Sequence, residues 1–473
     1  MTKLKKNIGY QTIYQILSTC LPLITSPYLS RILGAEKLGV YSYTQSIVNY
    51  FVLFAMLGMA NYGTKSIAEV SNDKKEYSKT FFSLLALQII TCSIALVVYI
   101  FYLFFCDKDN LLISSIQVIS ILACYLDINW LFFGLEKFKI TVIRNCYIKI
   151  VTVILILTLV KTSDDLWIYV LIMVLSTFFS QFVLWLYVPR LITKVKFNYA
   201  DIIKHIKPNI VLFIPLAAMS VYHVMDKTML GIFSTFEESG YYYNADKVIN
   251  IPVGILNGIT TVIMPRITSL ISSEKHDEAL NLFEKSLLAT MCIATALTFG
   301  IAAISDEFVP FFFGEGYQNC IILIKVLSPV LIFKGFSNVF RYLYFIPYGM
   351  NKEYIYSIIG GVLINLCANS LLIPRYGAMG AVIGTVIAEF VVCLLQYIFT
   401  VSKANLIKTL IECLLFLLNG GIMYGAVRLT ISMVSCSLLF KILIGVLVGA
   451  IVYLGILFIV FIAQMFYRKN CKV

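Results

Sequence analysis

Four basic residues lie inside long apolar runs of the sequence, where charge is costly: Lys227, Lys247, Lys334 and Arg341. A charged side chain near the centre of a membrane helix costs about 2.5–3.5 kcal/mol on insertion scales, so it usually faces other protein or a water-filled cavity. These cations outnumber the acidic residues that could pair with them in the same half of the chain. The pattern therefore predicts a cavity that attracts anions.

Polar side chains, many of them amides, recur at helical spacing in the first two apolar segments of each half of the chain. The stripes contain Gln11, Gln15, Gln45, Asn49, Asn250 and Asn257. Because they occupy equivalent segments, we predict that they face one another across one cavity. The alternative is that they hydrogen-bond neighbouring helices together, as small and polar residues commonly do in membranes.

Three carboxylates inside apolar segments are candidates for a proton or sodium site, since intramembrane carboxylates often serve as relays. They are Asp127, Asp226 and Glu389. Asp226 could instead form a structural ion pair with Lys247. The sequence has no nucleotide-binding motif, no HExxH and no GxSxG, and its cysteines show no metal-ligand spacing. We therefore expect no metal, no catalytic residue and no cofactor beyond coupling to a proton or sodium gradient.

These residues must be positioned by membrane helices. The chain has 473 residues, of which 60% are hydrophobic and only 13% are charged. A spanning helix needs roughly 20 apolar residues, so the sequence has room for many spans and little else. About fourteen apolar segments can be recognised, near residues 8–32, 38–62, 80–105, 111–133, 140–160, 166–188, 208–232, 240–264, 283–304, 321–348, 354–373, 378–401, 407–428 and 438–466. The predicted fold is an all-α integral membrane protein.

The net charge of +12 is concentrated in short connections between the apolar segments. With the N-terminus in the cytoplasm, the positive-inside rule places most Lys and Arg residues inside, and both termini become cytoplasmic. Examples on the predicted inner side are Lys3, Lys74, Lys139, Lys207 and Arg468. This distribution argues against a nucleic-acid partner and identifies the lipid bilayer as the surroundings.

Similar junctions recur along the chain and indicate an internal repeat. Leu33-Gly34 followed by Gly39 matches Leu230-Gly231 followed by Gly240. The repeat unit holds six segments, and an even number gives two lobes inserted in the same orientation. We predict two parallel six-helix lobes, 1–200 and 201–402, and two additional helices in 403–473. The charged stretches 71–79 and 272–285 are predicted to form helices at the interface.

Several motifs resemble the Wzx-type polysaccharide flippases of the multidrug/oligosaccharidyl-lipid/polysaccharide exporter superfamily. The resemblance covers essentially the whole chain and is carried by PLITSPYLSRILG at 22–34, GVYSY at 39–43, DKTMLG at 226–231, YYYNADK at 241–247, MPR at 264–266 and PRYGAMGA at 374–381. It implies two six-helix lobes plus two trailing helices that work by alternating access.

The resemblance also implies a function and a cargo. The protein would move an undecaprenyl-diphosphate-linked oligosaccharide from the cytoplasmic to the outer leaflet of the bacterial cytoplasmic (inner) membrane, for O-antigen, capsule or exopolysaccharide synthesis. Independently of the resemblance, the four cations would compensate the diphosphate, and we hypothesise that Arg31 and Lys65 help to gate the first lobe or to recruit the headgroup. A glycan polymerase and glycosyltransferases would be partner enzymes. The chain itself would be a transporter and not an enzyme.

Three other functions are weighed against this one. A cation or drug antiporter of the same superfamily would need an acidic cavity, whereas the excess charge here is basic. A lipid II-type flippase would have similar charge but would not have the SPYLSRILG opening at 26–34. A membrane glycan polymerase or ligase would be expected to need a sizeable extracytoplasmic loop, and every predicted outer connection is short.

Overall fold

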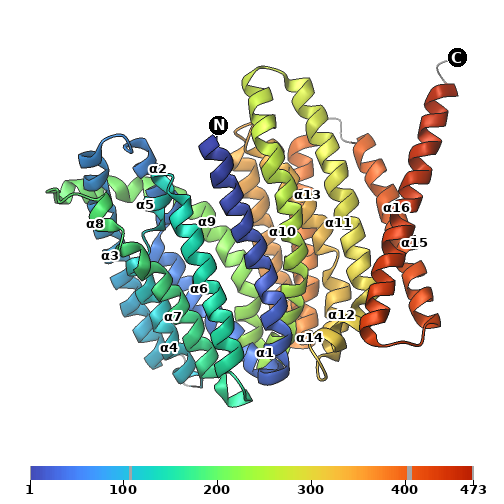
Figure 1. Cartoon of the computed structure of the whole chain (residues 1–473), viewed down its shortest axis with the longest axis horizontal. Coiled ribbons are helices and arrows are strands. Elements are labelled where there is room, and N and C mark those ends of the chain that lie inside the picture. The colour runs from blue at the N-terminus through green and yellow to red at the C-terminus, as the bar shows by residue number, and fades with distance from the viewer. Residues whose placement is uncertain (1, 106–108, 402–406, 471–473) are drawn as a thin grey trace. The chain divides into compact units, whose positions relative to one another are not determined.

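The structure is a computed structural model that describes residues 2–105, 109–401 and 407–470. The side chains of 2–17, 19–20, 215, 401, 407–408, 410 and 460–470 lie outside the description. Within these ranges every regular element is a helix, and no strand occurs (Figure 1). The all-α prediction is confirmed.

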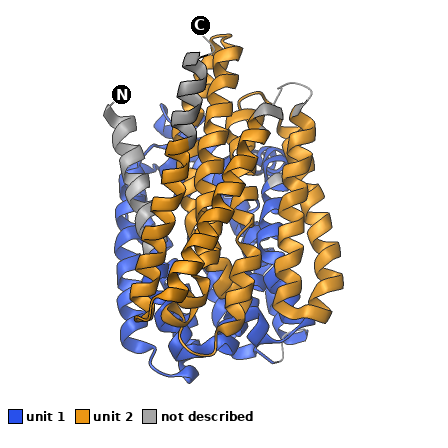
Figure 2. Ribbon diagram, turned by 90° about the vertical axis from the view of Figure 1, so that its right-hand side faces the viewer, with its two compact units in different colours: residues 1–240 blue, residues 241–473 orange. Residues whose placement is uncertain are grey.

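The chain divides by packing into two compact units, residues 1–240 and 241–473 (Figure 2). The predicted lobes are 1–200 and 201–402. The predicted lobes follow the sequence repeat, whereas the two units follow packing contacts. The helix that begins near residue 200 packs with the first unit. The predicted boundary at 402/403 lies outside the described residues. The lobe division therefore stays a prediction.

The first unit contains helices of very different length. They are α1 (Thr2–Met56), α2 (Met59–Glu69), α3 (Lys74–Phe105), α4 (Leu111–Leu126), α5 (Asn129–Gly134), α6 (Phe138–Leu159), the 3-10 turn η1 (Ser163–Asp165), α7 (Leu166–Trp185), α8 (Val188–Leu191) and α9 (Tyr199–Phe233). Its core is built around the buried rings of Phe81, Trp130 and Phe132.

The second unit begins within α10 (Phe236–Ser272). It continues with α11 (His276–Phe312), α12 (Gln318–Leu327), α13 (Val330–Phe340), the π-helical turn η2 (Arg341–Phe345), α14 (Asn351–Val401), α15 (Ile407–Met433) and α16 (Leu438–Asn470). The trailing helices α15 and α16 pack on α11 through a cluster centred on Met423, Val427 and Tyr453.

Eleven helices in the described ranges are long and apolar enough to span a membrane, or twelve when the bent pair within α9 counts as one span. Two of the eleven, Leu21–Glu69 and Asn351–Thr400, have 49 and 50 residues. A straight helix of that length would measure about 75 Å, more than twice the hydrocarbon thickness of about 30 Å.

Glycine breaks divide both of these long helices where the sequence predicts a junction between two segments. Gly34 has φ 75° and Gly377 has φ 53°, backbone conformations that strongly favour glycine. Division at these two positions would add two spans to the twelve. The predicted number of about fourteen stays a prediction, as does the cytoplasmic location of both termini, whose side chains are not described.

Several predicted boundaries are wrong in detail. The segment 38–62 is not one helix, because α1 ends at Met56 and α2 follows after Leu57 and Gly58, both with positive φ. The segment 111–133 matches the candidate span Leu111–Gly134, although the helix within it is interrupted between α4 and α5. The stretches 71–79 and 272–285 do not form separate helices, since α3 begins at Lys74 and α11 begins at His276.

The break between α4 and α5 has a tertiary cause. The amide of Gln88 in α3 donates to the backbone carbonyls of Cys124 (2.5 Å) and Asp127 (3.0 Å). The indole of Trp130 donates in turn to the Gln88 side-chain oxygen at 3.0 Å. A buried amide thus satisfies the carbonyls that the broken helix leaves exposed, as a low-dielectric interior requires.

Two glycines of the predicted repeat junctions meet within the first unit. A Cβ atom at Gly39 would overlap the backbone of Phe236, and a Cβ atom at Gly240 would overlap the backbone of Ala35. Only glycine allows this approach, which brings the hairpin around Gly34 against the start of α10.

Candidate functional site

In the second unit, α10 and α13 bring predicted polar residues together. The Lys334 ammonium group donates to the side-chain oxygen of Asn250 at 3.1 Å. The Asn250 amide donates to the Asp246 carboxylate at 2.6 Å and to the Asp246 carbonyl at 2.9 Å. Asn250 therefore connects a half-buried cation to a carboxylate one turn away on its own helix.

A second contact joins the same two helices two turns further along. The Asn338 amide donates to the side-chain oxygen of Asn257 at 2.6 Å. This bond is the interhelical role that the sequence offers as the alternative to cavity lining. A ligand-binding role for Asn257 stays a prediction.

Aromatic rings surround Arg341, at the point where α13 becomes a π-helical turn. The guanidinium carbon lies 4.8 Å from the Tyr342 ring centre and 5.0 Å from the Tyr354 ring centre. Both distances are within cation–π range. In the described part of the chain, neither Arg341 nor Lys334 is in an ion pair, and the buried Nε atom of Arg341 has no hydrogen-bond partner.

An aromatic ring also holds Lys247, whose ammonium nitrogen lies 4.1 Å from the Tyr243 ring centre one turn earlier in α10. We define the cation row as the three basic residues of this unit, Lys247, Lys334 and Arg341. Lys334 contacts an amide, and Arg341 contacts two tyrosine rings. Such partners orient a cation and leave much of its positive field available to an anion.

The remaining predicted cations belong to the first unit. Lys227 is half-buried in α9 beside the buried Asp226, and Arg31 is exposed near the Gly34 break. The neighbouring Thr228 hydroxyl lies 2.8 Å from that of Ser46, so this part of α9 packs on α1. Arg31 does not line the two polar cavities of this unit that contain Gln45 and Arg144.

The predicted amides Gln45 and Asn49 line a cavity of about 290 Å³ inside the first unit. The Gln45 amide donates to Asn49 at 2.9 Å. Asp127 lines the same cavity and accepts hydrogen bonds from the Asn129 backbone (3.0 Å) and side-chain amide (2.8 Å). The side chains of Gln11 and Gln15 lie outside the described residues.

A second polar cavity of about 450 Å³ lies in this unit, and it contains cations that the sequence analysis overlooked. We call it the polar chamber; its lining includes Ser18, Asn129, Arg144, Asn145, Lys149 and Gln181. Met173, Thr177 and Gln181 line both this chamber and the smaller cavity.

Hydrogen bonds connect the chamber to Asp127. The Arg144 guanidinium donates to Asn129 at 3.1 Å and to Asn145 at 2.6 and 3.0 Å. The Asn129 amide also donates to Gln181 at 3.0 Å. The Lys149 ammonium donates to Ser18 at 2.6 Å. The available signal was two basic residues in the otherwise apolar segment 140–160.

The third predicted carboxylate lies in the second unit. Glu389 is 5% exposed, in the second half of α14. Asp127 belongs to the first unit. A role in ion coupling stays a prediction for both residues and for Asp226.

Comparison with known proteins identifies the family. The polysaccharide biosynthesis protein family matches residues 4–271, which is more than half of the chain. The chain belongs to this family, and the resemblance to Wzx-type polysaccharide flippases is confirmed.

Two curated relatives match almost over their full length. A putative O-antigen transporter of Escherichia coli (strain K12) is 25% identical over 415 residues, covering 85% of this chain and 98% of the relative. The capsular polysaccharide biosynthesis protein CapF of Staphylococcus aureus is 26% identical over 413 residues, covering 83% and 98%.

A solved structure shares the fold. The lipid II flippase MurJ in an inward closed conformation superposes with a TM-score of 0.77 and 16% identity, covering 98% of this chain and 100% of that chain. At this identity the likeness concerns the fold alone. Family and fold together define a multi-pass membrane transporter, and the prediction that the chain is not an enzyme is confirmed.

Proposed function

We propose that this protein is a flippase for polyprenyl-diphosphate-linked oligosaccharide repeat units, working by alternating access in a bacterial cytoplasmic membrane. The family and the names of the relatives support a polysaccharide precursor as cargo. The single observation that carries the proposal is the cation row, since a diphosphate is the anionic part of such a cargo.

The physical task defines what the protein must provide. Sugar hydroxyls lose their hydrogen bonds in hydrocarbon, at a cost of several kcal/mol for each unpaired polar group. A polar path removes this barrier while the prenyl chain remains in lipid. Lys247, Lys334 and Arg341 would bind the diphosphate, and a role for Lys227 and Arg31 of the first unit stays a prediction.

Amides and carboxylates would have different roles in this cycle. Asn250 orients Lys334 toward the cargo, and Gln45 and Asn49 offer hydrogen bonds to sugar hydroxyls. Asp127, Asp226 and Glu389 are the proposed sites of proton or sodium coupling. Glycosyltransferases that build the repeat unit and a polymerase that consumes it would act before and after this step.

The location of the cargo tests the proposal. Cells without the gene should accumulate lipid-linked sugar on the cytoplasmic face, inaccessible to an impermeant lectin added to spheroplasts. The wild-type gene should restore access, and Arg341→Ala should not, at equal protein level. Unpolymerised sugar on the outer face of the deletion strain would support a polymerase instead. Loss of resistance to cationic dyes with normal glycan would support a drug antiporter.

A further inference from the structure

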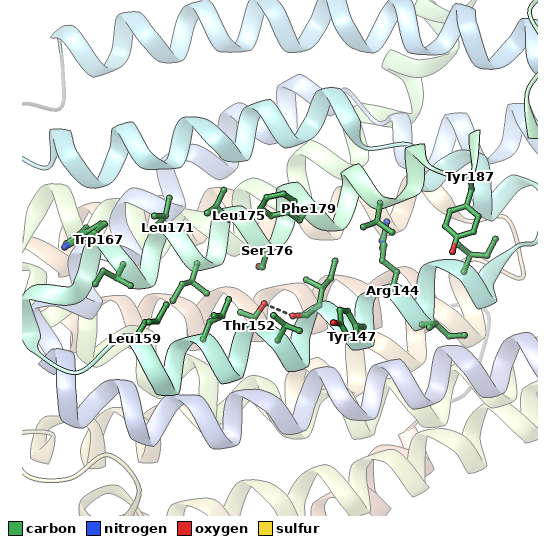
Figure 3. A pocket seen from close by; sticks show the side chains of 18 of the residues that line it. Arg144, Tyr147, Thr152, Leu159, Trp167, Leu171, Leu175, Ser176, Phe179 and Tyr187 are labelled. Carbon is green, nitrogen blue, oxygen red and sulfur yellow. Dashed lines mark hydrogen bonds between the residues drawn. The ribbon is translucent and has the colours of Figure 1, made fainter. Parts of the chain in front are cut away.

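A long apolar groove follows the seam between α6 and α7 of the first unit. Its volume is about 1210 Å³. Figure 3 shows leucine side chains from both helices along it, with Trp167 and Leu159 near one end and Arg144 and Tyr187 near the other. We call it the α6–α7 groove.

The groove is about as long as the hydrocarbon core of a membrane is thick. α6 has 22 residues, which corresponds to about 33 Å of helix, close to the hydrocarbon thickness of about 30 Å. Trp167 and Tyr187 mark its two ends, as aromatic residues do at membrane interfaces. Lys139 also lines it, close to the end that the charge pattern predicts as cytoplasmic. The groove is therefore long enough to run from one predicted interface to the other.

The polar chamber lies directly behind this groove. Four residues line both spaces: Arg144, Ile148, Thr152 and Ser176. Arg144 is only 7% exposed, and it lies in the half of α6 next to Lys139. An apolar channel and a polar chamber thus share one wall, with a buried guanidinium in that wall.

The chamber has the charge of an anion site. Among the described residues that line it, Arg144 and Lys149 are basic and none is acidic. Neutral amides orient the guanidinium, through Asn129 and Asn145. Asp127 is connected to this network through Asn129 and lines the adjacent cavity. Together, Arg144, Lys149 and Asp127 carry a formal charge of +1.

We propose that the α6–α7 groove and the polar chamber form a binding site for a polyprenyl chain that carries a phosphate or diphosphate. The chain lies along the groove, and its anionic head reaches Arg144 and Lys149 from the cytoplasmic end. This inference rests on the proposed function, because it gives the lipid chain and the anionic head of the same cargo a second binding site in addition to the cation row.

Groove length favours this occupant over an ordinary phospholipid. A phospholipid acyl chain spans one leaflet, about half of the hydrocarbon thickness. A groove that continues through both leaflets matches a chain long enough to follow it from one interface to the other. The basic chamber near one end matches an anionic head, since opposite charge in a low-dielectric setting is strongly attractive.

Photo-crosslinking tests the site in the full-length protein. The purified chain is placed in phosphatidylcholine nanodiscs with a sugar-free, benzophenone-bearing polyprenyl diphosphate, and the labelled peptides are identified. We expect labelling of α6 and α7, with unlabelled polyprenyl diphosphate competing at least about tenfold better than phosphatidylglycerol. Equal competition by phosphatidylglycerol, or labelling only elsewhere, would overturn the proposal.

A matched pair of tryptophan variants tests the groove on one helix. Leu155 lines it, whereas the adjacent Ile154 is exposed outside it. Leu155→Trp fills the groove and should lower labelling by at least about fivefold, and Ile154→Trp should leave it unchanged. Equal labelling in the two variants would contradict the groove.

Variants of Arg144 test whether the chamber binds the anionic head of the lipid. Arg144→Gln should weaken competition by the diphosphate about tenfold and leave competition by the uncharged polyprenol unchanged, with Arg144→Lys restoring part of the loss. An equal loss for both ligands would indicate a structural role and remove the anion site.

Failure of this inference and failure of the proposed function give different results. A wild-type protein that exports glycan, with labelling insensitive to Leu155→Trp and Arg144→Gln, would overturn the site alone. A wild-type protein that binds no polyprenyl diphosphate anywhere and exports no glycan would overturn both.

Discussion

Two regions of the second unit hold basic side chains in opposite ways. Arg428 of α15 donates to both oxygens of Glu307, at 3.1 and 2.9 Å, and lies 3.2 Å from Asp306. Lys325 of α12 contacts the same Asp306 at 2.8 Å. Two cations thus meet two carboxylates, and the formal charges cancel.

Arg341 and Lys334 have rings and an amide where Arg428 has carboxylates. Carboxylates fix a cation and neutralise it, which suits an anchor between helices. Rings and amides orient a cation without cancelling its charge, which suits a site that must accept and release an anion. The difference separates basic residues that hold the fold from basic residues proposed to bind cargo.

The largest expected effect is on stability, at the neutralised region. Arg428→Ala leaves the buried Glu307 without its guanidinium partner and should destabilise the protein by about 1.5–3 kcal/mol. Thermal unfolding in detergent measures the loss, and export per folded molecule should remain. If export per molecule fell while stability stayed normal, the contrast between the two regions would be wrong.

Arg341→Ala should have the opposite profile. It removes a cation held between two tyrosine rings, so we expect export to fall at least about tenfold, equivalent to about 1.4 kcal/mol in binding, with little change in the unfolding temperature. The glycan exported per unit of membrane protein is the measurement. Arg341→Lys keeps the charge and should retain part of the activity.

A smaller loss is expected at Lys334, because Asn250 links it to Asp246 and part of its charge is already compensated. Lys334→Met should lower export about threefold to tenfold, and Lys334→Arg should preserve it. Export measured at increasing salt in inverted vesicles is a second readout, since loss of a partly exposed cation should weaken the salt dependence.

The general plan of this molecule follows from local sequence signals, whereas the contacts between elements do not. Gly34 and Gly377 lie at junctions that charge and glycine content indicate. The break at Asp127 had no such signal, because it depends on Gln88 from another helix. The average hydrophobicity of the segment 111–133 predicts a continuous helix there.

In the candidate site, too, local sequence signals predict single residues but not the contacts between helices. Helical spacing predicts that Lys334 and Arg341 share a stripe, but not that α10 supplies Asn250 and that Tyr342 and Tyr354 hold the guanidinium. Arg144 and Lys149 were visible as charges in an apolar segment. The sequence does not show that α5 supplies the amide of Asn129 to Arg144, or that α1 supplies the hydroxyl of Ser18 to Lys149.

The smallest effect is expected at Asn338, whose amide bonds Asn257 across the α10–α13 contact at 2.6 Å. Such bonds between membrane helices contribute about 0.6 kcal/mol on average, because the separated helices find other partners. Replacing both residues by leucine avoids an unpaired amide, so the Asn257→Leu, Asn338→Leu double variant should unfold within a few degrees of wild type and keep most export. A single Asn338→Leu variant leaves Asn257 unpaired and should be the less stable of the two, by unfolding temperature. A severe export defect in the double variant, at normal stability, would show that these amides contact cargo. Asn257 and Asn338 would then belong with the residues that bind cargo and not with those that hold helices together.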